Sequence, residues 1–107
     1  MPLYLYQAAY TSESLAAQMK NPVNRLDVVA EQVRGAGVRF VAGGFSLGEH
    51  DLAVVMEAPD DTTMAAVAVA ISAGGAVRNA RTTRLLSGAE YVDALKKAAS
   101  IGYRPAK

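Results

Sequence analysis

Residues 38–61 read VRFVAGGFSLGEHDLAVVMEAPDD and carry the signals for two strands and the start of a helix. Two runs rich in aliphatic, aromatic and β-branched residues, 38–47 and 52–58, flank the polar turn Gly48-Glu49-His50-Asp51, a pattern typical of a β-hairpin. Pro59 ends the second run, because proline has no N–H to donate to a sheet, and Asp60 or Asp61 can then cap a helix.

Strand and helix signals alternate on either side of this hairpin. Leu3–Tyr10 (LYLYQAAY) predicts a first strand, and a short helix follows over residues 12–20. Asn21-Pro22 interrupts that helix and can start another one, which Gly35 and Gly37 end. In this second helix the apolar side is Val23, Leu26, Val29, Ala30 and Val33, and the polar side is Arg25, Asp27, Glu31, Gln32 and Arg34.

The C-terminal half continues the alternation. We expect a helix over residues 62–73 that Gly74-Gly75 ends, and a strand over residues 76–86. The segment Ser87-Gly88-Ala89-Glu90 fits a capping box and opens a last helix that runs to about Ser100. The order βαββαβ plus one helix predicts an α+β, ferredoxin-like domain with strand order 4-1-3-2. Residues 1–100 are expected to form this single domain and residues 101–107 a C-terminal tail.

The composition excludes several classes of protein. The chain has 107 residues, of which 51% are apolar and 20% charged, a formal net charge of +1 and no cysteine. These values fit one folded domain and exclude a disulfide framework, a cysteine-ligated metal site and a thiol nucleophile. No basic leader precedes the first strand, and the most apolar stretch, residues 64–73, is half of the roughly 20 residues that span a membrane. We therefore expect a cytoplasmic protein.

The strands are apolar on both faces. Because successive side chains of a strand point to opposite sides, Leu52, Val54 and Met56 share one face and Ala53 and Val55 the other. Two helices cover only one face of such a sheet, and a large exposed apolar patch is uncommon on a soluble monomer. We expect a two-fold homodimer in which the second faces of two sheets pack together.

Two alternatives concern the helices. The last helix, with Val92, Leu95 and Ala99 turned inward, could instead fold across the open face of its own sheet. The helix over residues 64–73 has almost no polar side, which fits either a further assembly surface, and hence a higher oligomer, or tight packing within the domain.

Several segments carry a family resemblance. They are MPLYLYQAAYTSE at the start, the hairpin FSLGEHDLAVVMEAPDD, the helix end SAGGAV, the strand RTTRLLS and the closing GYRP. Together they resemble the GYD domain family, small bacterial and archaeal proteins named for a Gly-x-Tyr-Asp turn between the second and third strands. Gly48 and Asp51 occupy the glycine and aspartate of that motif, and His50 replaces the tyrosine. The resemblance implies a fold similar to dimeric α/β barrels and no particular reaction, because the family has no assigned activity.

His50 is the candidate catalytic residue, since it is the only histidine and adjoins Asp51. Adjacent strand residues point to opposite faces, however, so the two side chains are not expected to form a dyad. A polar turn residue is the competing interpretation of His50, and Asp51 is expected to bond turn amides.

Gln7, Glu57 and Arg81 form a candidate ligand-binding set. Alternation places them on the outer sheet face beside Leu3, Leu5, Ala53, Val55 and Thr83. Buried charge is costly unless it is paired, so these groups would either satisfy one another, as a Glu57–Arg81 ion pair, or bind a ligand.

The remaining patterns favour a binding function. We expect neither a metal nor a cofactor, because one histidine and scattered carboxylates give no ligand spacing and no phosphate-binding glycine motif is present. Residues 78–107 carry seven basic and two acidic residues, but the third strand lacks stacking aromatics, so solvated surface charge is preferred over nucleic-acid binding.

We expect a homodimer that binds a small apolar ligand as a binding or sensory module. The alternative is a cofactor-independent enzyme of the dimeric α/β-barrel type, in which Arg81 positions the substrate and His50 or Glu57 moves a proton. RNA binding is the third hypothesis.

Overall fold

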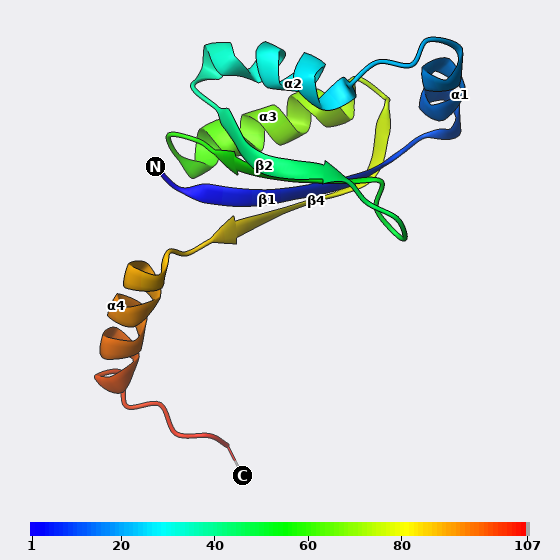
Figure 1. Ribbon diagram of the computed structural model, residues 1–107. Helices are drawn as coiled ribbons and strands as arrows, with labels where there is room; N and C mark the ends of the chain where they lie inside the picture. The colour runs from blue at the N-terminus through cyan, green and yellow to red at the C-terminus, as the bar shows by residue number, and fades with distance from the viewer. Residues whose placement is uncertain (107) are drawn as a thin grey trace.

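The computed structural model describes residues 1–106 and shows a four-stranded sheet with helices, in the expected order (Figure 1). Lys107, the end of the expected tail, lies outside the described residues. The elements are β1 (Leu3–Tyr10), α1 (Ser12–Lys20), α2 (Arg25–Val33), the 3₁₀ turn η1 (Arg34–Ala36), β2 (Arg39–Phe45), β3 (Leu52–Glu57), α3 (Asp61–Ala73), β4 (Val77–Leu85) and α4 (Gly88–Ala99).

The sheet has the order β2-β3-β1-β4, and each neighbouring pair is antiparallel. This is the expected 4-1-3-2 order, so the ferredoxin-like α+β prediction is confirmed. Two irregularities interrupt the ladders, one between Gln7 and Ala9 of β1 and one between Phe40 and Ala42 of β2. Each shifts the pairing by one residue, and therefore changes which side chains oppose each other.

Short polar side chains start the helices. Asp60 caps α3 by accepting a hydrogen bond from the Thr63 N–H at 2.7 Å, and the predicted capping box of α4 is present. The predicted start of α2 is wrong, because its cap is Asn24 and not Asn21. The Asn24 side chain accepts from the Leu26 N–H at 3.1 Å, so α2 begins at Arg25, after Pro22.

The core lies between the sheet and the helices α2 and α3, which cover the same face (Figure 1). Tyr4, Tyr6 and Ala8 of β1 are buried on this side, as are Leu52, Val54 and Met56 of β3. From α3, Met64 and Val67 complete the core. Because α2 and α3 both pack on this face of the sheet, neither of them shields the opposite face from solvent.

Helix α4 projects away from the domain (Figure 1). All its residues are exposed, and Val92 and Leu95 are 48% and 52% accessible, so the expected inward face is wrong. The radius of gyration is 17.2 Å, compared with about 13 Å for a compact domain of similar length. The last helix therefore does not cover the open face of its own sheet, and that alternative is also wrong.

Among residues 1–106, no helix combines the length and the apolar character that a membrane span requires.

Candidate functional site

The outer side of the sheet is a mainly apolar surface with a few polar groups, which we call the open face. Residues that pair across neighbouring strands lie on the same face of the sheet. Leu5, for example, pairs with Val55 on β3 and with Thr83 on β4. The open face comprises Leu3, Leu5, Gln7, Arg39, Ala42, Ala53, Val55, Glu57, Arg81, Thr83 and Leu85. In the described part of the chain, no helix packs against it (Figure 1).

Two of the three predicted ligand-binding residues lie together. Gln7 and Arg81 are register partners on β1 and β4. Glu57 lies at the far end of β3, opposite Leu3, whereas Gln7 opposes Ala53. Glu57 and Ala53 are four positions apart along β3, which is about 13 Å.

The expected Glu57–Arg81 ion pair is wrong. The Glu57 carboxylate instead accepts from the Arg39 guanidinium at 3.1 Å. The irregularity in β2 causes this pairing, because an uninterrupted ladder from Phe45–Leu52 would place Phe40 opposite Glu57. The sequence signal for a bend is Gly43, where an added Cβ would lie 2.5 Å from the Ala53 carbonyl oxygen.

The turn residues His50 and Asp51 have separate environments. Asp51 Oδ2 accepts from the Tyr10 N–H at 2.7 Å, and the Asp51 N–H donates to the Ala8 carbonyl at 2.9 Å. Asp51 therefore ties the turn to the irregular end of β1, which corrects the expectation that it bonds amides of its own turn. The His50 carbonyl accepts from the Ser46 hydroxyl at 2.7 Å, so the backbone of this residue closes the turn.

The tyrosines of β1 lie on the helix side. Tyr4, Tyr6 and Tyr10 are 3%, 2% and 6% accessible and belong to the core. Nucleic-acid-binding versions of this topology stack bases on aromatic side chains of the exposed sheet face. The described open face has no such platform, and this speaks against the RNA-binding hypothesis.

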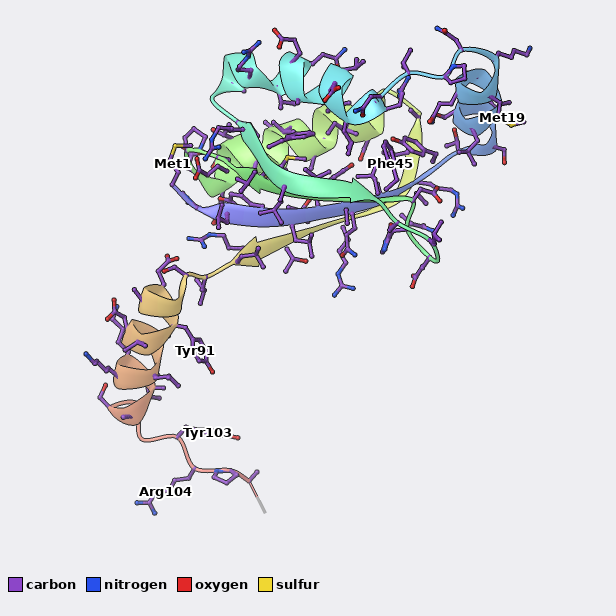
Figure 2. The ribbon with its side chains drawn as sticks, in the orientation of Figure 1. Met1, Met19, Phe45, Tyr91, Tyr103 and Arg104 are labelled. Carbon is purple, nitrogen blue, oxygen red and sulfur yellow. The ribbon has the colours of Figure 1, made fainter. Side chains whose placement is uncertain are left out.

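Helix α4 adds a second apolar surface that the sequence analysis had placed inside the domain. Tyr91, Val92 and Leu95 on the helix are half-exposed, and Ile101 and Tyr103 follow in the tail. Figure 2 shows Tyr91 and Tyr103 projecting from α4 and the tail, well away from the packed helices. A polar face and an apolar face on one isolated helix are typical of a helix that packs on a partner.

Arg84 anchors the first turn of α4 to the domain. Its guanidinium lies 5.8 Å from the centre of the Tyr4 ring, 3.6 Å from Asp61 Oδ1 and 3.4 Å from Glu90 Oε2. The Ser87 backbone N–H, with a smaller contribution from Arg84, lowers the pKa of Glu90. The beginning of α4 therefore has a defined place beside β4, while the rest of the helix is free to contact another molecule.

Comparison with known proteins gives a matching family and a named relative. The family model of the GYD domain matches residues 4–95. A protein of Thermus thermophilus is 32% identical over 78 residues, which cover 73% of this chain and 82% of the relative. That relative bears the name glutamine synthetase and cystathionine beta-lyase binding protein.

Proposed function

The chain belongs to the GYD domain family, and we propose that it is a noncatalytic binding module that works as a homodimer. The observation that carries this proposal is the uncovered open face, together with the exposed apolar side of α4. The relative named as a binding protein supports a binding role over a catalytic one.

A second copy of the chain fits both surfaces. A two-fold axis would bring two open faces together about 10 Å apart, with Leu5 and Val55 of each chain in the centre. The α4 helices would then lie along the partner's sheet or against each other, which buries Val92 and Leu95. Full burial of one such aliphatic side chain contributes roughly 1.5–3 kcal/mol before the cost of association, so the dimer needs many of them from both surfaces together.

The polar residues of the open face fit the same assembly. Gln7 and Arg81 lie side by side on β1 and β4 and would supply polar contacts in the middle of the interface, either to the partner chain or to a small ligand held between the sheets. Glu57 already has Arg39 as a partner, so it would enter the interface as a paired charge.

Sedimentation equilibrium tests the homodimer. We expect the wild-type chain at micromolar concentration to have twice the 11.2 kDa mass of one chain. Val55→Lys, in the centre of the open face, and Leu95→Lys, on α4, should shift the equilibrium to monomer. Val28→Lys is the matched control, because Val28 is 43% exposed on α2, away from the open face.

Leu95→Lys keeps this test decisive even if Val55→Lys fails to fold, since Leu95 is already half-exposed in the isolated chain. A wild-type chain that sediments as a monomer would refute the homodimer. A dimer that both lysine variants leave intact would show that the two chains meet through another surface, of which the apolar α3 is the first to examine.

A protein partner is the second part of the proposed function. The relative's name identifies two enzymes as its partners, and we propose that this chain likewise binds an enzyme of its own host. Titration calorimetry with that host's purified glutamine synthetase and cystathionine beta-lyase tests this. Serum albumin serves as the control protein, and heats indistinguishable from those with albumin would remove both enzymes as partners.

A further inference from the structure

A cavity of about 320 Å³ lies between the sheet, α2 and α3, on the side opposite to the open face. This volume is at the lower end of the range of small-molecule sites. Its walls are mostly aliphatic and aromatic, and the polar side chains Tyr6, Tyr10, Arg25 and Gln32 also line it. A mainly apolar cavity with a few converging polar groups is the usual form of a ligand site.

Two of these polar groups are buried and unsatisfied. Tyr6 is 2% accessible, and its hydroxyl has no hydrogen-bond partner among residues 1–106; the same holds for the buried Nε of Arg25. Within that range no carboxylate lies close enough to Arg25 to form an ion pair. Buried polar atoms normally have hydrogen-bond partners. An unpaired phenol hydroxyl and an unpaired guanidinium nitrogen in one cavity therefore indicate that a bound molecule supplies their partner.

Tyr10 and Arg25 mark one end of the cavity. Arg25 is the first residue of α2, and Tyr10 is the last residue of β1. Burial raises the pKa of Tyr10, which the adjacent Arg25 partly offsets, and burial together with Tyr10 raises the pKa of Tyr6. All three groups line the same cavity, and both phenols stay protonated as hydrogen-bond donors at neutral pH.

The other end of the cavity is mainly apolar, and Gln32 near the end of α2 is its polar residue. Val33, at the end of α2, lines it together with the register partners Phe40 and Met56. A ligand in this cavity would therefore place a polar head beside Arg25 and an apolar tail toward Phe40.

We propose that this cavity binds a small carboxylate with an apolar tail, whose head accepts hydrogen bonds from Arg25 and Tyr6. Guanidinium and phenol groups are donors that match a carboxylate, and the fixed fork of arginine binds both of its oxygens. This proposal deepens the binding function above. It concerns a site inside one chain, so carboxylate binding and dimer formation succeed or fail separately.

Calorimetric titration with octanoate tests the proposal. Two further probes divide the ligand into its parts, because octanol has the tail without the charge and acetate has the charge without the tail. We expect octanoate to bind at least about tenfold more tightly than either, since a hydrogen bond to a charged group and the buried tail each contribute that much.

Two variants test the residues. Arg25→Gln should weaken octanoate binding about tenfold or more, while Arg34→Gln, which alters an exposed arginine just after α2, should leave it unchanged. Tyr6→Phe should also weaken binding severalfold, yet raise the thermal midpoint of the ligand-free protein, because it removes a buried hydroxyl without a partner. A purely structural tyrosine would not produce this opposite pair of effects.

Three results would overturn the proposal: no octanoate binding at millimolar concentration, equal binding of octanoate and octanol, or wild-type affinity in both Arg25→Gln and Tyr6→Phe. The first removes the ligand class, the second leaves only an apolar cavity, and the third places the site elsewhere. Sedimentation of the same samples shows separately whether the homodimer persists.

Discussion

Asp51→Ala should destabilise the fold, because the Asp51 side chain connects the β2–β3 turn to β1. Its carboxylate accepts from the Tyr10 N–H at 2.7 Å, at the end of a strand whose pairing with β4 is irregular. A hydrogen bond to a charged group contributes about 1.5–3 kcal/mol, so we expect a loss of about 2 kcal/mol of unfolding free energy. Asp51→Asn keeps an acceptor without the charge and should lose about 1 kcal/mol.

Urea unfolding followed by circular dichroism measures this loss. With a denaturant dependence of roughly 1–3 kcal/mol per molar, the midpoint of Asp51→Ala should fall by about 1 M. All variants are compared at one protein concentration, because dimer formation adds to the apparent stability. Glu49→Ala is the control in the same turn and should stay within about 0.5 kcal/mol of wild type. An Asp51→Ala midpoint equal to that of Glu49→Ala would refute the structural role, and the aspartate of the family's turn motif would need another explanation.

Further expectations concern β2, α4 and the ion pair on the open face. Gly43→Ala should cost about 2–4 kcal/mol in urea unfolding, because Gly43 has φ of 155° and no room for a Cβ, whereas Gly44→Ala, with open space, should cost less than about 1 kcal/mol. The lowered pKa of Glu90 means that its contribution to the α4 cap is complete above the ordinary value of 4.5 and is lost as pH falls through the lowered value. An NMR titration should show the Ser87 amide signal moving in that acid range in wild type and staying fixed in Glu90→Gln. Arg39→Gln should change stability by less than about 1 kcal/mol, since the Arg39 side chain is 66% exposed, and a larger effect would mean that the dimer buries this pair.

Local signals in the chain predicted most of the fold. The capping box at Ser87 and Glu90, the cap at Asp60 and the helix-ending Gly37, which has φ of 80°, are interactions within a few residues. Alternation along β1 and β3 correctly separated the core face from the open face. The start of α2 was misplaced because Asn21 and Asn24 are both good caps, and the choice depends on how the chain reaches the sheet.

The candidate site was less predictable. Glu57 was assigned to Arg81, but the irregularity in β2 brings Arg39 opposite it, and a shift of one residue leaves little trace in the sequence. Arg25 was assigned to the polar side of its helix, yet it lines the cavity together with Tyr6 and Tyr10. A side chain at the first position of a helix points back past the helix N-terminus, so the two-sided pattern of the helix does not decide what it contacts.

The order of strands and helices, the caps that begin them and the presence of apolar residues on both sides of the sheet follow from residue types at short spacings, so the amino-acid order alone implies them. Three features arise only when distant segments meet: the register that sets Arg39 against Glu57, the cavity lined by α2, α3 and the sheet, and the departure of α4 from the domain. Each depends on small differences in packing free energy between alternative arrangements of elements far apart in the chain. Those differences are sums over many contacts of the folded molecule, so no short stretch of sequence determines them.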